Sequence, residues 1–483
     1  MNYKVGLLLT MLAMMVISVI FYQIDDGTGF ARVHQHREAT PKKETRKDAA
    51  FSTHLPIISI DTRGKEIPGS RDDSEKGITY ESLLTDVSII DHDKKLNHPD
   101  DNPTKKAMAQ VAYRGNSSRL FDKKSLKVKF VKEDGSDDDV EVCGMHKDDE
   151  WVFHGPFLDR TLMRNYLCYN VAGEIMEYAP NCRYFELMVN GEYQGLYLAV
   201  EPPTQGKHRI NIEKSKDDRA ETSYIVRWDR STKGDHLLNN FTFYTELSGV
   251  SALDVRYPGK NRIDEKKMKY IEEDISRIEK TLYSYDLNYS KKASYKNSID
   301  MNSFAEYFII NEFFQNVDAG RFSTFYYKDV KGKVKLSVWD FNNACDNYID
   351  YIYGGAGFTM QDSPWFGMLL KDPEFVELVV QKYRNLRKGV LSDDYLMRYI
   401  DETQKYLGSA VDRNYEKWGY VFDLKNADDH NFLNPVSRNY DSYEKSVGQL
   451  KGWIKSRGSW LDKHIDSLYQ YCQDSKTKNT LLK

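Results

Sequence analysis

The chain has 483 residues, enough for two or three domains' worth of hydrophobic core, and its 40% hydrophobic and 29% charged content is typical of a globular protein rather than a disordered one. A net charge of -4 argues against a dedicated nucleic-acid binder, because such proteins usually carry a basic bias, so we expect no nucleic-acid partner. The 5 cysteines are widely scattered and none has CxxC spacing, so the sequence indicates neither a zinc site nor a disulfide framework.

An apolar segment lies at the N-terminus. Residues 5–21 are almost wholly apolar and follow Lys4, and about 17 to 20 such residues can span a bilayer as a helix. A signal peptide is the alternative, but its apolar region is usually shorter and ends in a small-x-small cleavage site, which residues 20–24 lack. We therefore predict a single-pass anchor over 1–22 in the cell membrane, with a cytoplasmic N-terminus and an extracytoplasmic main domain.

Residues 23–53 are polar and charged, which predicts a solvated linker. The region that follows, 54–205, is predicted to be β-rich. In the strand 125–130, for example, Leu126, Val128 and Phe130 alternate with Lys127 and Lys129, the period of a half-buried strand. The other strands predicted here are 55–61, 107–113, 184–189 and 195–200.

Two further features belong to this β-rich region. Asn190-Gly191 separates the last two strands and is a strong hairpin signal, and Glu201-Pro202-Pro203 ends the second of them because proline cannot continue a ladder. One helix is predicted at 159–176 from the spacing of its apolar residues.

The remainder, 206–470, is predicted to be mainly helical, with a tail at 471–483. Strand-like runs occur at 224–228 and 241–247, and the helical patterns are those that start at 264, 303, 375, 393 and 442. The order indicates an α+β protein with a β-rich N-terminal lobe, a mostly helical C-terminal lobe and a cleft between them.

Two acidic residues in the middle of the chain are the best candidates for chemistry. Asp318 follows the apolar helix 303–314, and Asp340 follows the strand 334–338 of a predicted hairpin. Either one alone is more often a capping or surface residue. One carboxylate after a helix and a second after a hairpin strand is how a phosphotransferase presents a base and a metal ligand to a nucleotide.

An ordered set of segments resembles the spore coat protein H (CotH) kinase family over roughly 54–470. The set consists of 55–62, 114–119 with 123–127, 159–165, 189–197 with Glu201, and the segments around Asp318 and Trp339-Asp340. The resemblance implies an atypical protein-kinase-like two-lobe fold. It also implies transfer of the ATP γ-phosphate to Ser or Thr of coat or cell-surface proteins, with Mg²⁺ or Mn²⁺.

The residues acquire roles on this basis. Asp318 is the expected acceptor-side base, and Asp340 with Asn342 the expected metal ligands. Lys124 begins a strand beside a turn, where its ammonium group could reach phosphate or simply be exposed. Arg114 could contact phosphate or brace its own loop. Glu201 is expected at the link between the lobes, where the nucleotide base would lie.

Two positions depart from the family pattern. Ser323 or Thr324 stands where many members carry a metal-binding Asn, and Asn342 stands where many carry a second acid. Both changes lower the negative charge of the site. The alternative is therefore a non-catalytic, membrane-anchored surface or spore-coat assembly protein that retains the scaffold.

Overall fold

The computed structural model of the chain describes residues 32–472, except for 48–49, 71–80, 116, 232–234, 243–250, 260, 284–293, 351, 353 and 427–430. The predicted anchor, 1–22, lies outside the described residues. Within the described part, no helix is long and apolar enough to cross a membrane.

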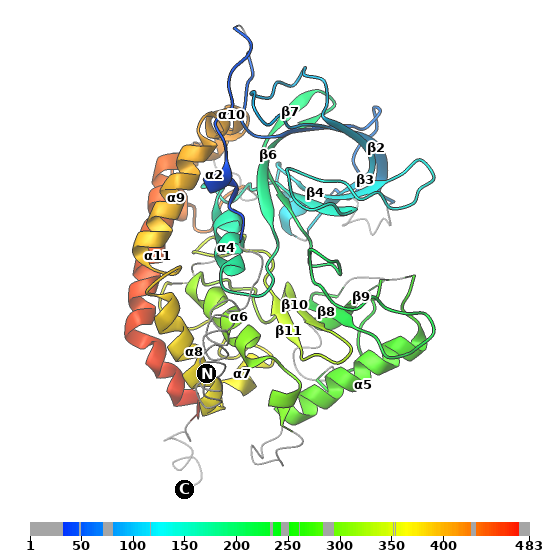
Figure 1. The fold of residues 1–483 in the computed structure, drawn as a ribbon. Helices are drawn as coiled ribbons and strands as arrows, with labels where there is room; N and C mark the ends of the chain where they lie inside the picture. Colours follow the sequence, from blue (N-terminus) through cyan, green and yellow to red (C-terminus); the bar gives the residue numbers. More distant parts are fainter. Residues whose placement is uncertain are drawn as a thin grey trace, which may run out of the picture.

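The first half of the described chain forms a closed barrel (Figure 1). Its strands follow one another in the order β1-β2-β3-β4-β5-β7-β6, and β1 closes it by pairing in parallel with β6. The seven strands are β1 (Ile57–Asp61), β2 (Leu83–Ile90), β3 (Lys105–Arg114), β4 (Ser125–Val131), β5 (Glu150–His154), β6 (Cys182–Val189) and β7 (Glu192–Val200).

In β4, the predicted alternation of apolar and charged residues places the two kinds of side chain on opposite faces of the strand. Leu126, Val128 and Phe130 are buried in the barrel's apolar interior, whereas Lys127 and Lys129 line a cleft on the outside of the barrel. Asn190 and Gly191 join β6 to β7 with φ values of 51° and 79°, both in the left-handed region that a two-residue hairpin turn requires.

The second half contains a sheet with the order β11-β10-β8-β9, with helices beside and below it in the view of Figure 1. Several helices begin at a side-chain cap, as Asp264, Asp300 and Ser392 do for α5, α6 and α9. These elements are β8 (Tyr224–Asp229), β9 (Ala252–Tyr257), α5 (Glu265–Leu282), α6 (Met301–Phe313), β10 (Thr324–Lys328), β11 (Lys335–Ser337), α7 (Phe366–Leu369), α8 (Pro373–Leu386), α9 (Asp393–Leu407), α10 (Ser409–Trp418) and α11 (Tyr443–His464).

The predicted α+β class, with a β-rich N-terminal part and helices in the C-terminal part, is confirmed. Three details differ from the sequence prediction. The strands close into a barrel, and the helix predicted at 159–176 is shorter, as α4 (Arg164–Gly173). The strand predicted at 241–247 falls largely outside the described residues, and β9 begins later, at Ala252.

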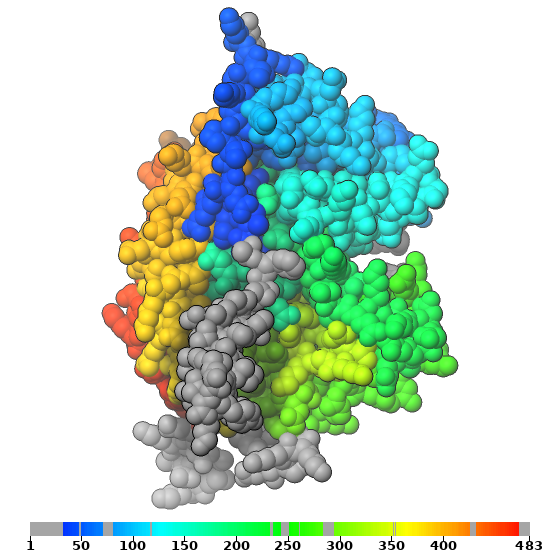
Figure 2. Space-filling view, in the orientation of Figure 1, coloured from blue at the N-terminus to red at the C-terminus, as the bar shows by residue number. Residues whose placement is uncertain are grey.

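Residues 32–47 do not form the solvated linker predicted for 23–53. This segment, which includes α2 (Gln35–Glu38), packs on the folded body along the seam between the C-terminal helices and the barrel (Figure 2). The Gln35 side chain bonds both the N–H and the C=O of Tyr184 in β6, and His34 bonds the hydroxyl of Tyr399 in α9. The polar composition misled because these polar side chains have buried partners.

Helix α10, from the C-terminal part of the chain, packs back on the barrel, so the two halves are joined by side-chain contacts as well as by the connector. Asn414 of α10 accepts hydrogen bonds from the N–H of Leu196 and from Nζ of the buried Lys123, at 3.2 and 2.7 Å. Trp418 Nε1 donates to the carbonyl of Gln194 at 2.8 Å.

This docking makes Gly195→Ala a test of the contact between α10 and β7. Gly195 has a φ of +114°, and an added Cβ lies 2.7 Å from Asn414 Oδ1 and 2.9 Å from Trp418 Nε1. We expect a loss of about 2–3 kcal/mol in the free energy of unfolding, measured by urea denaturation. Gly191→Ala, where φ is +79° and no atom lies within 4 Å, is the control for backbone strain alone. Equal losses in the two variants contradict the prediction.

Candidate functional site

A cleft of about 520 Å³ separates the outer face of β4 and β5 from the second sheet. Lys127 and Lys129 line it from the barrel, Arg227 and Trp339 line it from the opposite side, and the connector 202–205 lines it between the two halves. In Figure 2 the cleft opens at the right-hand edge, between the cyan barrel and the green second sheet. Both predicted acidic residues lie close to this cleft.

Asp340 lies immediately after the cleft residue Trp339, three residues beyond the end of β11 at Ser337. Its φ of 57° is in the left-handed region, a strained conformation for a residue with a side chain, and its N–H donates to the Tyr169 hydroxyl at 2.9 Å. Burial raises the pKa of Asp340, the charge of Arg114 opposes that rise, and the charge of Asp229 adds to it. The fold therefore holds this carboxylate in a fixed position that is costly to ionise without a cation.

Asp318 lies near Asp340, as the sequence predicts. Burial, followed by the negative charge of Asp340, raises the pKa of Asp318 to about 6. Asn343 Nδ2 donates to Asp318 Oδ2 at 2.6 Å, and the Arg230 guanidinium lies 4.0 Å from Oδ1. A carboxylate with a pKa near neutrality is suited to accept a proton from a hydroxyl group.

Arg114, at the end of β3, points into the same region. Its guanidinium makes no hydrogen bond or ion pair with any described residue, and it lies 5.5 Å from the centre of the Trp339 ring. Burial lowers the pKa of Arg114, and the charge of Asp340 is the strongest opposing influence. No described residue of its own loop holds the side chain, and a half-buried guanidinium of this kind is suited to bind phosphate.

Lys124 is not among the described residues that line the cleft. Its Nζ donates to the carbonyl of Phe121 at 3.0 Å. The neighbouring Lys123 is buried, with Nζ bonded to the Leu196 carbonyl at 2.6 Å, and so serves the packing of α10. The cleft instead contains Lys127, which has no hydrogen bond or ion pair with a described residue, and Lys129, which is paired with Asp137 and Asp149.

Glu201 lies at the link between the halves, but its side chain does not line the cleft. Its Oε2 accepts hydrogen bonds from the N–H and the Nδ2 of Asn181, at 3.0 and 2.9 Å. The residues that follow, Pro202 to Gln205, form the cleft wall. Any contact with a nucleotide base here comes from the connector and not from the carboxylate of Glu201.

At the positions that depart from the family pattern, Asn342 and Thr324 already use their side-chain oxygens within the fold. Asn342 Oδ1 accepts from Asn165 Nδ2 at 2.7 Å. Thr324 is buried, and its Oγ1 accepts from the N–H of Gly320 and contacts the Tyr307 hydroxyl. Thr324 therefore holds the loop after Asp318 in place, and Asn342 orients the loop after Asp340.

A divalent cation still fits this donor set. Within the described residues, no three His, Cys, Asp or Glu side chains cluster closely enough to hold a metal ion. Magnesium, however, is commonly held by one or two carboxylates together with substrate phosphates and water. Asp340 and Asp318 supply the carboxylates. Asn316 supplies a buried Oδ1 that has no partner among the described residues, while its Nδ2 donates to the Asp340 carbonyl.

Two contributors were not predicted as site residues. Asp229 ends β8, and its charge raises the pKa of both Asp318 and Asp340. The signal for it was an apolar strand ending in Trp228-Asp229, which repeats the Trp339-Asp340 pattern. Asn165 of α4 bonds His154 of the barrel, the N–H of Phe341 and Asn342, so it positions the loop that carries Asp340.

The match to a known protein family supports this site. The family described as CotH kinase protein matches residues 111–461, which is most of the chain. The chain belongs to the CotH kinase family. The matched region contains Arg114, Lys127, Asp318 and Asp340, and membership supports a kinase-like function. A comparison with curated proteins finds no match to this chain.

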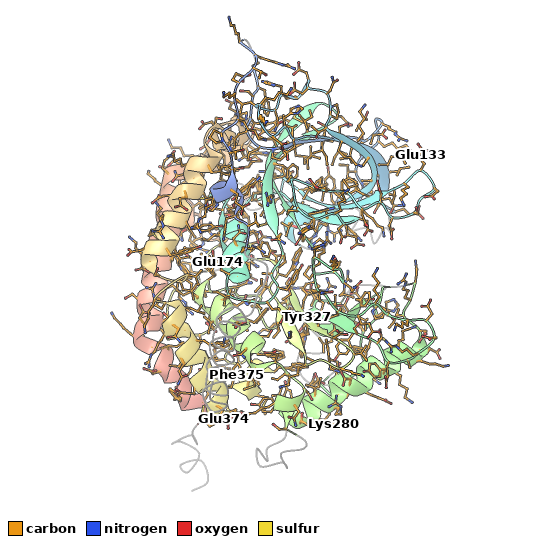
Figure 3. All side chains as sticks on the ribbon, viewed as in Figure 1. Glu133, Glu174, Lys280, Tyr327, Glu374 and Phe375 are labelled. Atoms are coloured by element: carbon orange, nitrogen blue, oxygen red, sulfur yellow. The ribbon has the colours of Figure 1, made fainter. Side chains whose placement is uncertain are left out.

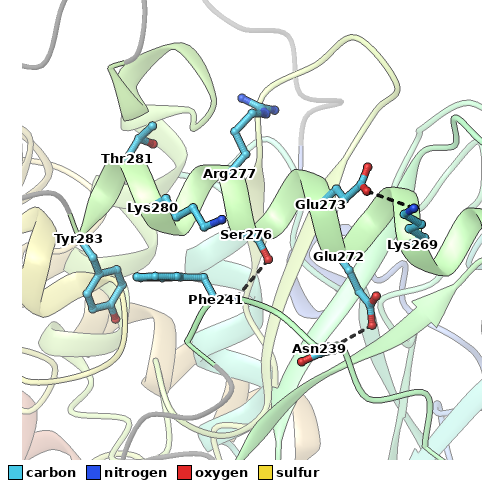
Figure 4. Close-up of a pocket in the computed structure, with 10 residues that line it drawn as sticks. All are labelled: Asn239, Phe241, Lys269, Glu272, Glu273, Ser276, Arg277, Lys280, Thr281 and Tyr283. Carbon is cyan, nitrogen blue, oxygen red and sulfur yellow. Dashed lines mark hydrogen bonds and ion pairs between the residues drawn. The ribbon is translucent and has the colours of Figure 1, made fainter.

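A second hollow in this CotH kinase family protein lies along α5 (Figure 4). Its polar groups largely satisfy one another, since Asn239 N–H donates to Glu272 at 2.8 Å and Phe241 N–H donates to Ser276 at 3.1 Å. The residues predicted to carry the chemistry are not among its described lining residues.

Proposed function

We propose that this protein is an ATP- and metal-dependent protein kinase whose nucleotide binds in the cleft between the barrel and the second sheet. The observation that carries the proposal is the Arg114 guanidinium, which pairs with no described residue and lies at the cleft within electrostatic range of the half-buried Asp340 carboxylate. A cation and a carboxylate held together in this way suit the phosphates of a nucleotide and the metal ion that accompanies them.

In the proposed reaction, the oxygen of a Ser or Thr hydroxyl forms a bond to the γ-phosphorus, and the bond from that phosphorus to the β,γ-bridging oxygen breaks. ADP leaves with the electron pair of the broken bond, and Asp318 accepts the hydroxyl proton. Arg114 and Lys127 offset negative charge on the transferred group. A divalent cation bound at Asp340 would neutralise further phosphate charge.

The direct test is transfer of labelled γ-phosphate from ATP to Ser- or Thr-containing acceptor proteins, with Mg²⁺ and Mn²⁺ compared. The proposal expects transfer by the unaltered protein and none by Asp340→Asn, with the fold of both checked by circular dichroism. Equal transfer by the two proteins contradicts the assignment.

A non-catalytic scaffold is the second candidate, favoured by the engagement of Asn342 Oδ1 by Asn165. It predicts neither transfer nor an increase in Tm when ATP and a divalent cation are added, because a ligand that binds the native state raises its stability.

We also propose that residues 5–21 anchor the protein in the cell membrane with the main domain outside. Protease protection of the domain in intact cells contradicts that orientation.

The different positions of Lys127 and Lys124 relative to the cleft give a separate prediction about ATP binding. We expect Lys127→Met to raise the KM for ATP by about 10-fold or more, because it removes an unpaired cation from the cleft. Lys124→Met is the matched control and is expected to leave KM unchanged, since Lys124 Nζ bonds the Phe121 carbonyl. Steady-state kinetics at varied ATP concentration test both variants. A larger effect in Lys124→Met than in Lys127→Met contradicts the structural assignment.

A further inference from the structure

A polar cavity of about 370 Å³ lies apart from both the proposed nucleotide cleft and the hollow along α5. The N-terminal segment at Arg32 and Val33, the loop 144–146, the start of β6 and the loop 207–211 enclose it. Tyr327 of β10 also lines it, and Figure 3 labels this side chain on the second sheet. The cavity and the cleft share none of their described lining residues.

The cavity is strongly basic. Six of its described lining residues are Arg, Lys or His, and Glu177 is the one carboxylate among them. Glu177 is itself ion-paired with Lys335. The side chains around this cavity therefore leave an excess of positive charge that attracts an anion.

Some of these cations hold the protein together. Arg32 donates to the carbonyl of Ala179 at 2.8 Å and to Asn170 at 3.0 Å. Arg209 donates to Thr204 at 2.8 Å and lies 3.1 Å from Asp148. These contacts fix the walls of the cavity and do not need a ligand.

Two other cations are not committed to the fold. Arg183, on β6, and Lys207 make no side-chain hydrogen bond or ion pair with any described residue. The Arg183 guanidinium lies close to Gly144, where an added Cβ would be 3.7 Å from Nη1. Like charges in one cavity repel, so holding both without a partner costs free energy that a bound anion would recover.

Two histidines on the remaining wall of the cavity can also donate hydrogen bonds. The rings of His146 and His208 stack with centroids 3.8 Å apart and an angle of 17° between their planes. An arginine fork, an ammonium group and imidazole N–H groups around a small cavity match a multiply charged tetrahedral anion better than a single carboxylate.

We propose that this cavity binds a phosphate group, either as free phosphate or as a phosphorylated side chain. Arg183 supplies the bidentate contact, and Lys207 supplies the second charge. The site is separate from the nucleotide cleft, and the proposal does not depend on kinase activity.

The experiment is isothermal titration calorimetry of the full chain with inorganic phosphate and with pyrophosphate. A doubly altered protein, Arg183→Met with Lys207→Met, is compared with a control of equal charge, Arg262→Met with Lys214→Met, in which both residues lie outside the cavity. A third protein, Arg114→Met with Lys127→Met, removes phosphate binding in the cleft. We expect saturable binding by the unaltered protein, the control and the cleft variant, and at least a 10-fold loss of affinity in the cavity variant.

A phosphoserine peptide and its unphosphorylated form distinguish the source of the phosphate. Tighter binding of the phosphopeptide than of phosphate identifies a phosphorylated side chain, and the reverse identifies free phosphate; both support the proposal. No saturable binding of any probe overturns it. An equal loss in the control overturns it too, because that result indicates attraction by overall charge alone.

Discussion

Asp318→Asn is expected to lower phosphate transfer by about 10²–10⁴-fold while making the ligand-free protein more stable. The activity falls because an amide cannot accept the hydroxyl proton. The stability rises because the folded protein holds the ionised carboxylate at a cost, which its pKa of about 6 records. The amide oxygen can still accept the hydrogen bond from Asn343 that the carboxylate accepts now.

The pH dependence of this stability has a definite sign. The pKa of Asp318 is raised from 3.8 to about 6 in the folded state, so the folded state binds this proton more tightly than the unfolded state. The resulting stability is fully present below pH 3.8 and is lost as the pH rises through 6. The gain from Asp318→Asn is therefore largest at pH 7 and above, where it is at most about 3 kcal/mol, and it disappears toward pH 4.

Thermal unfolding of both proteins across this pH range, without nucleotide or metal, measures the difference. Asp217→Asn, at an exposed position, is the control and is expected to change Tm little. If Asp318→Asn loses both activity and stability, the carboxylate has a structural role and the assignment as a base is wrong.

The local elements of this fold could be predicted from the sequence because their causes are local. The alternation in β4 and the Asn190-Gly191 turn each act within a few residues, and so do the caps of the helices. The closure of the barrel could not be predicted in this way. It depends on parallel pairing of β1 with β6, which brings Ile57 opposite Glu186, and no short pattern specifies a partner so far along the chain.

In the candidate site too, local sequence pattern predicts some of the residues and not others. Asp318 and Asp340 could be found because each follows a recognisable element, and the structure brings their charges together. Which lysine lines the cleft could not be predicted from local sequence pattern alone. Lys124 precedes β4 and bonds back to Phe121, whereas the period of two places Lys127 on the outer face, and only the position of the second sheet makes that face a cleft wall.

Arg457→Met is expected to destabilise the protein by about 3–5 kcal/mol, the largest effect on stability that we predict. Arg457 and Glu312 are buried, and Nη2 of the arginine lies 2.9 Å from Oε2 of the glutamate. Arg457 also donates to the carbonyls of Gly355 and Gly357, at 2.8 and 2.6 Å. Removing the guanidinium leaves a buried carboxylate without its cation and frees the carbonyls of this loop.

Glu312 connects this ion pair to the functional site. Its Oε1 accepts hydrogen bonds from the N–H groups of Thr359 and Met360, and its helix, α6, leads directly to Asp318. Burial raises the pKa of Glu312, and the charge of Arg457 is the main influence that opposes the rise. Loss of Arg457 should therefore loosen the end of α6 and reduce activity as well as stability.

Chemical denaturation of Arg457→Met tests the prediction, with Arg384→Met as the control. Arg384 pairs with Asp466 at the surface, where both side chains are more than half exposed, so its loss should cost no more than about 1 kcal/mol. Arg457→Met combined with Glu312→Gln removes both buried charges and is expected to be more stable than Arg457→Met alone. If the double variant is no more stable, the cost lies in the lost carbonyl contacts and packing, and not in an unpaired buried charge.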